Sequence, residues 1–479
     1  MKSCFVALPV TILACLSSYA EAQPKPGETP IVFESDAGDS VEAFEGSVSV
    51  PENRHAADSR QITLKYVRFP ATGETAGDPI IYLSGGPGGS GIQTAKYRRF
   101  PLFMAMREFG DVIAFDQRGT GASNDLPNCT SSKHVSATKP TSDAKFFALE
   151  RAAFAECLDF WKSESVDVYG YTTAESVADL EALRRHLGAE QIDLWGISYG
   201  SHLSLAALQQ IDDQIGRVVI TAIEGLDQTV KQPARGDAYF DRLQAAIDTV
   251  PAAKAKYPDV RALIARVLTG LDQTPLQLEI PLQDGGTAPY LLQKRDLQKI
   301  TSALVADPAR AVWALDVFQA LDAGDTAPVI ALMQRAVDPT DTAISFRPMT
   351  VLMDVASGSS PERRLMIKQQ AETALMGTHM NFSMHLETVD PSLDLGDAFR
   401  EAPVSDVPTL VISGTLDGRT YPESGLEATT GLSKRQVVLV ENGGHNVFMQ
   451  SPEVTSVIQD FMRGETVDGR EIIAELPEF

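Results

Sequence analysis

The sequence predicts an α/β fold that has a mostly parallel central sheet and a long, mainly helical insertion. Compact runs rich in isoleucine and valine alternate with helical patterns in the first half of the chain and return near its end. Such alternation is typical of a parallel sheet covered by helices on both faces. Between residues 228 and 402 the hydrophobic spacing is helical and buried-strand runs nearly vanish. We therefore expect one sheet domain interrupted by a helical domain.

Composition limits the possible function classes. The chain has 479 residues, of which 43% are hydrophobic, so a large buried core is expected and wholesale disorder is excluded. It carries 64 acidic against 41 basic residues, a net charge of -23. This balance argues against nucleic-acid binding, which needs clustered Lys and Arg. The acidity otherwise indicates a well-solvated surface.

Residues 1–22 are predicted to be a signal peptide. A short positive start precedes the apolar run Phe5–Leu16, and Ala20-Glu21-Ala22 has the small-residue pattern of a cleavage site. The run is too short to span a bilayer. We expect an exported, periplasmic or secreted protein that begins at Gln23. The alternative is a lipoprotein, anchored to the membrane through lipidated Cys15.

Removal of the leader leaves two of the four cysteines, Cys129 and Cys157. An even pair in an oxidising compartment predicts a disulfide. The alternative is two unrelated thiols.

The predicted strands are apolar runs bounded by turn residues. Two antiparallel strands come first, at Ala43–Val50 and Ile62–Phe69, after a Pro-rich lead-in at residues 23–30. The parallel strands are Pro79–Ser84, Asp111–Phe115, Ile192–Gly196, Val218–Ile223, Leu410–Ser413 and Val437–Val440.

Helices are predicted between these strands. Thr172 and Glu175 form a capping box before an apolar stripe that ends at Gly188. Another helix is expected from just after Ser198 to about Gln210. The resulting domain plan is a core at 31–227 and 403–465, an inserted helical cap at 228–402, and a C-terminal tail at 466–479.

A candidate nucleophile lies at Ser198, in the pattern G-x-S-x-G formed by residues 196–200. A predicted strand precedes it and a predicted helix follows it. A strand-to-helix elbow holds a serine in a sharp turn, and small residues two positions away allow backbones to cross closely. The alternative is a serine in an ordinary tight turn.

A serine needs a base, and the base needs an acid that orients it. Asp417 follows one predicted strand and His445 follows the next, which gives the order Ser, Asp, His of the α/β-hydrolase fold. Asp406 and Glu441 are rival acids, but Asp406 precedes its strand and belongs at the opposite edge of the sheet. His445 is favoured because it alone among the histidines directly follows a buried strand.

The glycine-rich loop after Leu83 predicts an oxyanion hole. Pro87 has no N–H group, so Gly86 is the expected first donor and the backbone of Tyr199 the second. Gly86, Gly88 and Gly91 also fit a dinucleotide-binding pattern, with Asp116 following at the end of a strand. That alternative leaves the Ser, Asp and His set unexplained.

The sequence lacks the patterns of phosphate-binding and metal-binding sites, and one further loop is predicted to be structural. No Lys follows the glycines as in a phosphate-binding P-loop, and no His or Cys pattern has metal-ligand spacing, so neither a metal nor a cofactor is expected. The loop Asp116–Gly121 is predicted to be a salt-bridged structural turn, with a catalytic role as the alternative.

Together these motifs resemble the prolyl iminopeptidase and tripeptidyl aminopeptidase branch of the α/β hydrolases. The matching segments are Tyr82–Gly91 (YLSGGPGGSG), Asp116–Ser123 (DQRGTGAS), Trp195–Ser201 (WGISYGS), Gly414–Pro422 (GTLDGRTYP) and Gly443–Asn446 (GGHN). The family often has histidine where this chain has Ser84. The resemblance implies an α/β-hydrolase fold whose inserted cap covers the site, with acidic residues that hold the free amine of the substrate. Glu224 is a candidate for this role on position alone, because it follows the strand Val218–Ile223; a structural acid that caps the turn is the alternative.

The leading functional interpretation is an exported serine hydrolase that removes residues from the amino end of small peptides. The second is an ester or lactone hydrolase with the same machinery. The third is a lipid-anchored binding protein that has kept the fold and lost activity.

Overall fold

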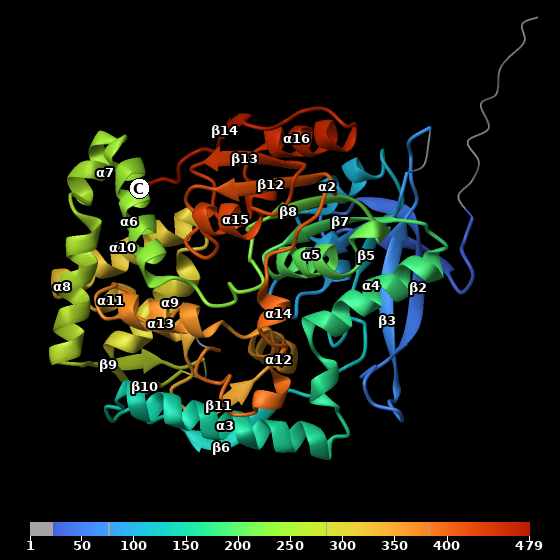
Figure 1. The fold of residues 1–479 in the computed structure, drawn as a ribbon. Coiled ribbons are helices and arrows are strands. Elements are labelled where there is room, and N and C mark those ends of the chain that lie inside the picture. The colour runs from blue at the N-terminus through green and yellow to red at the C-terminus, as the bar shows by residue number, and fades with distance from the viewer. Residues whose placement is uncertain (1–22, 75–76, 284, 382) are drawn as a thin grey trace, which may run out of the picture.

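The computed structural model describes residues 23–74, 77–283, 285–381 and 383–479 (Figure 1). The predicted leader, its cleavage site and Cys15 lie outside this part of the chain. Among the described residues no helix is long and apolar enough to cross a membrane.

The predicted α/β-hydrolase fold is confirmed: the core is a ten-stranded sheet in the order β1-β2-β3-β5-β4-β7-β8-β12-β13-β14. Its first strands pair antiparallel as far as β5, and all pairs from β5 to β14 are parallel. The strands are β1 (Thr29–Glu34), β2 (Ser40–Pro51), β3 (Gln61–Phe69), β4 (Ile80–Leu83), β5 (Val112–Phe115), β7 (Ile192–Ile197), β8 (Ile215–Thr221), β12 (Thr409–Gly414), β13 (Arg435–Glu441) and β14 (Glu471–Ile473).

Helices cover both faces of this sheet because its central strands are apolar on both sides (Figure 1). In β4, Ile81 and Leu83 join the hydrophobic cluster beneath α4 (Thr173–Leu187) and α5 (Tyr199–Gln210). Ile80 and Tyr82 face the opposite cluster. That cluster is formed with α1 (Gly91–Lys96), α2 (Phe100–Met106) and α16 (Pro452–Met462).

The predicted helix ends are close to those observed. Thr172 caps α4 by accepting a hydrogen bond from the backbone N–H of Glu175, and Gly188 ends the helix at φ +70°. The predicted capping box is only half formed, since the carboxylate of Glu175 instead accepts hydrogen bonds from Arg54.

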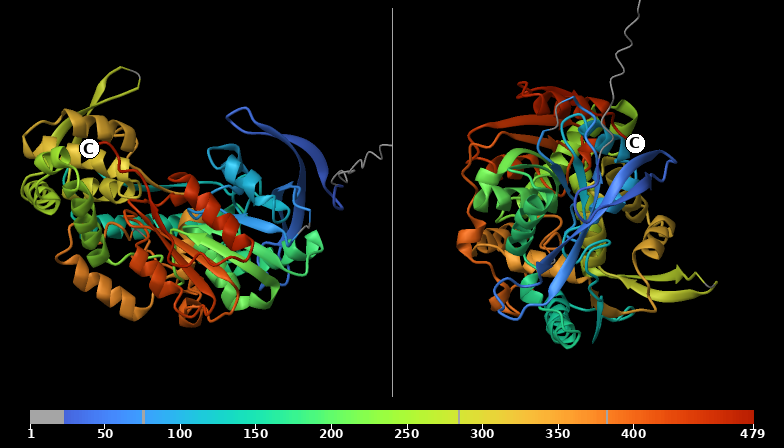
Figure 2. Two further views of the ribbon diagram at one scale, coloured as in Figure 1. Left: turned by 90° about the horizontal axis from the view of Figure 1, so that it is seen from above. Right: turned by 90° about the vertical axis from the view of Figure 1, so that its right-hand side faces the viewer.

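The insertion forms a separate helical layer with its own hydrophobic core (Figures 1 and 2). Its helices are α6 (Pro233–Asp248), α7 (Pro251–Lys256), α8 (Val260–Gln273), α9 (Lys294–Leu304), α10 (Pro308–Asp322), α11 (Ala327–Ala336), α12 (Pro348–Ser357), α13 (Pro361–Ala371) and α14 (Asp397–Arg400). A hairpin of β9 (Leu276–Pro281) and β10 (Thr287–Leu292) projects from it (Figure 2). The sequence did not predict this hairpin, because its strands alternate and lack the continuous apolar run of a buried strand.

The domain plan from the sequence differs from the structure at two points. The tail at 466–479 is more than an extension, since β14 joins the sheet and Phe479 packs against the core of the cap. The cap also receives chain from outside 228–402. β6 (Cys129–His134) pairs with β11 (Ala343–Phe346) of the insertion, and α12 packs in the core cluster beside α4.

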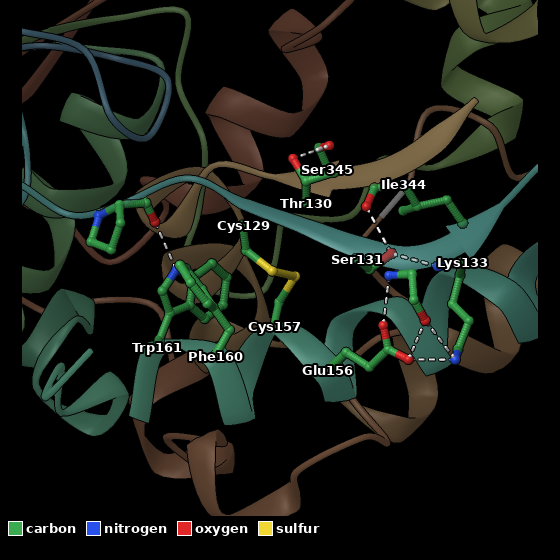
Figure 3. The surroundings of a disulfide bond; sticks show 12 residues. Cys129, Thr130, Ser131, Lys133, Glu156, Cys157, Phe160, Trp161, Ile344 and Ser345 are labelled. Carbon is green, nitrogen blue, oxygen red and sulfur yellow. Dashed lines mark hydrogen bonds and ion pairs between the residues drawn. A yellow bond between two sulfur atoms is a disulfide. The ribbon is translucent and has the colours of Figure 1, made fainter. Parts of the chain in front are cut away.

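A disulfide joins Cys129 of β6 to Cys157 of α3 (Asp143–Ser163), the pair that the sequence predicts, with Cα atoms 5.6 Å apart (Figure 3). Both cysteines are buried. Beside them, Trp161 donates its indole N–H to the carbonyl of Pro127 at 2.9 Å. The cross-link therefore fixes α3 under the strand that pairs with the cap.

Candidate active site

Five loops meet at the carboxyl edge of the parallel strands. β4, β7, β8, β12 and β13 are successive neighbours in the sheet. Carboxyl ends of parallel strands lie at one edge, so the residues that follow these strands gather there. They are Gly86, Ser198, Glu224, Asp417 and His445, in the order of their strands.

Ser198 stands between β7 and α5 with φ 56° and ψ −124°, a backbone conformation that few non-glycine residues adopt. The two flanking glycines make this turn possible. A Cβ on Gly196 would lie 2.4 Å from the carbonyl oxygen of Gly200, and one on Gly200 would lie 2.0 Å from that of Leu83. The tight turn that the sequence predicts is therefore present.

The backbone around Ser198 is fixed by neighbouring groups. Ser201 donates its hydroxyl to the carbonyl of Ser198 at 2.6 Å and accepts the backbone N–H of Glu224 at 2.9 Å. The side chain of Tyr199 is buried and bonds Thr173, so only its amide can face a substrate. In the described part of the chain, no acceptor engages that amide or the amide of Gly86.

His445 and Asp417 are joined by a hydrogen bond of 2.9 Å between Nδ1 and Oδ2. The other carboxylate oxygen of Asp417 accepts the backbone N–H groups of Arg419 and Thr420 at 2.7 and 2.9 Å. Thr420 also donates its hydroxyl to Oδ2 at 2.5 Å. Burial raises the pKa of Asp417, but the charge and hydrogen bonds of His445 and Thr420 outweigh it and leave the pKa below its usual value.

The rival residues lie elsewhere. The side chain of Asp406 is 80% exposed and pairs with Lys434 before β12, at the other edge of the sheet. Glu441 is exposed at the end of β13. Buried His202 bonds the carbonyl of Gly225 and the hydroxyl of Ser357, so it faces away from Ser198, as its position one turn along α5 predicts.

The glycine-rich loop lies directly against the elbow. A Cβ on Gly85 would be 2.9 Å from the Cβ of Ser198, and Gly86 has φ +129°. The loop is held from the side by Asp116, whose carboxylate accepts the hydroxyl of Ser90 at 2.6 Å and the backbone N–H of Ala122 at 2.7 Å. From above, Thr350 of α12 donates its hydroxyl to the carbonyl of Pro87 at 3.2 Å.

The loop Asp116–Gly121 is the salt-bridged turn that the sequence favours. Arg118 is fully buried, and its guanidinium contacts both carboxylate oxygens of Asp179 at 2.7 Å. It also donates to the carbonyl of Glu52 at 2.7 Å. These contacts fix the turn and occupy the guanidinium of Arg118, so it is not available to bind a substrate.

A cavity lies between Ser198 and His445 on the core side and α12 on the cap side. Glu224 lines it, as expected from its position, but its carboxylate already contacts the ammonium of Lys231. Asp354 of α12 also lines it, and no donor among the described residues bonds its carboxylate. Burial and the charge of Glu224 raise the pKa of Asp354 well above its usual value.

Similarity to known proteins decides the family. A model of the alpha/beta hydrolase fold matches residues 78–452. The chain belongs to the α/β-hydrolase family. It is 27% identical over 229 residues to a tripeptidyl aminopeptidase of Streptomyces lividans, which covers 46% of this chain and 41% of the relative. It is also 27% identical over 184 residues to serine protease Hip1 of Mycobacterium tuberculosis, which covers 36% of this chain and 35% of the relative.

The chain thus spans less than half the length of these relatives. The tripeptidyl aminopeptidase and a probable proline iminopeptidase of Streptomyces coelicolor, 31% identical over 158 residues (33% of this chain, 36% of the relative), confirm the predicted resemblance to an aminopeptidase-like branch. A solved proline iminopeptidase of Mycobacterium smegmatis aligns over 88% of this chain and 98% of that chain, with a TM-score of 0.40 and 17% sequence identity.

Several residues of this α/β hydrolase escaped the sequence analysis. Asp354, Lys231 and Arg419 line the cavity beside Ser198, and Thr420 bonds Asp417. Only Arg419 and Thr420 carried a sequence signal, because they lie two and three residues after the expected acid. The described residues include no cluster of three or more His, Cys, Asp or Glu side chains that could hold a metal ion.

Proposed function

We propose that this α/β hydrolase is a serine hydrolase that cleaves residues from the amino end of small peptides. The observation that carries the proposal is the covered cavity, which brings two carboxylates, Glu224 and Asp354, next to Ser198 and His445. A carboxylate in a partly dry pocket attracts an ammonium group far more strongly than one at the surface.

In the proposed mechanism, Nε2 of His445 takes the proton of the Ser198 hydroxyl as its oxygen attacks the scissile carbonyl. Asp417 holds Nδ1 of His445, as the 2.9 Å contact supports, and stabilises the imidazolium. The amides of Gly86 and Tyr199 stabilise the oxyanion. His445 then gives its proton to the leaving amine, and water hydrolyses the acyl-enzyme by the same steps in reverse.

The free amine of the substrate is proposed to lie between Asp354 and Glu224. The Lys231 contact neutralises part of the charge of Glu224, so Asp354 contributes the unpaired oxygens. Because an ammonium group favours the ionised carboxylate, substrate binding should release a proton from Asp354.

The second candidate is a carboxylic ester or lactone hydrolase with the same residues. An assay that pairs a free-amine peptide with its acetylated form separates the two functions. We expect acetylation to lower kcat/KM at least about tenfold, since a charge-assisted hydrogen bond contributes roughly 1.5–3 kcal/mol. The preference should shrink in Asp354→Asn or Glu224→Gln. Equal rates on the two peptides would favour the ester hydrolase.

The nucleophile is tested separately with a fluorophosphonate probe. Ser198→Ala should abolish labelling and turnover, because losing a triad member costs several powers of ten in rate. Ser204→Ala, six residues further along the chain in α5, is the matched control and should be labelled normally. Labelling that survives Ser198→Ala would reject Ser198 as the nucleophile, and a wild type that is not labelled at all would favour the binding protein.

Export to the periplasm or medium, with a lipid anchor at Cys15 as the alternative, is proposed from the sequence of residues 1–22. The disulfide agrees with an oxidising compartment. N-terminal sequencing of the protein from its native host tests this: a start at Gln23 supports cleavage, and a blocked start at Cys15 supports the anchor.

A further inference from the structure

Two cationic side chains, Lys231 and Arg419, line the cavity with the two carboxylates, and only Lys231 has an ion-pair partner among the described residues. Lys231 contacts Glu224 and donates to the carbonyl of Gln228 at 2.8 Å. Arg419 lines the same cavity beside Ser198 and His445. No carboxylate of the described residues lies within 4.0 Å of its guanidinium, whose single hydrogen bond reaches the carbonyl of Ser302 at 3.5 Å.

The absence of an ion-pair partner in the described part of the chain distinguishes Arg419 from Arg363, which lines the adjoining cavity, and from Arg400 of α14. Arg363 binds Asp227 and Glu427, and Arg400 binds two aspartates. A guanidinium has five N–H donors, so most of those of half-buried Arg419 are available to a ligand.

The backbone from which the Arg419 side chain projects is held in place by hydrogen bonds. Its backbone N–H donates to Asp417 at 2.7 Å, and the preceding residue, Gly418, donates to the carbonyl of Val305 in the cap at 3.0 Å. Replacing the side chain therefore leaves the backbone hydrogen bond to Asp417 in place. Arg419 also lines a second small cavity with Lys231 and Arg363, and both of those cations are already paired with carboxylates.

We propose that Arg419 is a specificity-determining residue that binds a carboxylate group of the substrate. A guanidinium matches a carboxylate in planar, two-pronged geometry. The site then holds an ammonium group at Asp354 and Glu224 and a carboxylate at Arg419. That pair of charges fits a short peptide with both ends free. This rests on the proposed function and adds the class of substrate to it.

The carboxylate can come from the C-terminus of a dipeptide or from an acidic side chain. Binding to the Ser198→Ala variant, measured by calorimetry, distinguishes these sources without turnover. The first pair of probes is alanylalanine and its C-terminal amide. The second pair is two amidated dipeptides that carry glutamate or glutamine in the second position. We expect the acid to bind at least about tenfold more tightly than its neutral partner in one pair, as for a charge-assisted contact.

Arg419→Met in the same background should bring that ratio close to one, whereas Arg419→Lys should keep part of it. Arg310→Met removes an exposed arginine of α10 and should keep the full ratio. A ratio of one in both pairs for the parent protein would overturn the proposal, and so would a ratio that Arg419→Met leaves unchanged.

Turnover tests the proposed function independently. If the wild type hydrolyses short esters but no peptide, the aminopeptidase proposal fails, while the binding ratios still decide the role of Arg419. If it cleaves peptides with a free-amine preference but binds acids and amides equally, only the role of Arg419 fails.

Discussion

At the scale of single residues, the site depends on a hydroxyl that the sequence analysis did not single out. Thr420 donates to Oδ2 of Asp417 at 2.5 Å and lies 3.2 Å from Nδ1 of His445. It thus helps to hold the carboxylate ionised and in place against the imidazole. Because Asp417 is 1% exposed, water cannot easily replace this bond.

We predict that Thr420→Val lowers kcat/KM roughly ten- to hundredfold, since a hydrogen bond to a charged group contributes about 1.5–3 kcal/mol. The loss should appear at neutral pH, where the carboxylate is ionised in both proteins. Thr420→Ser keeps the donor and should behave nearly as the wild type. Steady-state assays of the three proteins measure the effect, and an unchanged kcat/KM in Thr420→Val would contradict the role.

At the scale of elements, the strand β7 and the helix α5 can form their turn only because glycines stand at the crossing points. We predict that Gly200→Ala unfolds the protein or lowers its free energy of unfolding by several kcal/mol, since the new Cβ would lie 2.0 Å from the carbonyl oxygen of Leu83. Gly270→Ala, within α8, is the matched control. Its Cβ meets no atom within 4 Å, and alanine should stabilise the helix by up to about 1 kcal/mol. Denaturant titration of both variants tests the contrast.

The other end of β7 holds a buried carboxyl group. Burial raises the pKa of Asp193 to about 7, with Asp78 adding to the rise and Arg217 opposing it. The folded protein therefore keeps a proton that the unfolded chain releases above its ordinary pKa of 3.8. From this group we predict that stability is greatest below about pH 4 and falls by up to about 4 kcal/mol as the pH rises through 7.

Asp193→Asn should flatten this dependence. The unfolding free energy of the variant should therefore rise relative to that of the wild type between pH 5 and pH 8. Asp406→Asn is the control, because that carboxylate is exposed. If the difference in unfolding free energy between the wild type and Asp193→Asn is the same from pH 5 to pH 8, the raised pKa of Asp193 is refuted.

How much the sequence could predict differs between core and cap. The continuous apolar runs of β4, β7 and β12 and the loops that follow them gave the sheet and its candidate Ser, Asp and His set. The pairing of β6 with β11 could not be foreseen, because β6 is polar and its partner lies some 210 residues along the chain. Asp354 was missed for the same reason: its place above Ser198 depends on how α12 packs against the core.

At the scale of the whole molecule, the cap is part of the site and not only its cover. The backbone N–H of His445 donates to the carbonyl of Ala306 at 2.8 Å, and that of Gly418 to Val305 at 3.0 Å. A Cβ on Gly444 would meet Pro308 at 2.5 Å. The loops that carry His445 and Asp417 are therefore braced by the insertion, so disturbing the cap should disturb the geometry of the candidate acid and base.

The disulfide between Cys129 and Cys157 joins this assembly from below, because β6 pairs with the cap strand β11 while α3 packs on the core (Figure 3). We predict that the double variant Cys129→Ala, Cys157→Ala loses about 3–4 kcal/mol of stability, the loop-entropy value for a sequence separation of 28. Reduction should lower the melting temperature of the wild type but not of the double variant, which controls for effects of the reductant.

The labelling rate of Ser198 with a fluorophosphonate should fall near the lowered melting temperature, because the cap braces the loops of Asp417 and His445. Two free thiols in unfolded, unreduced wild-type protein would show that the bond does not form and would remove the basis for this coupling.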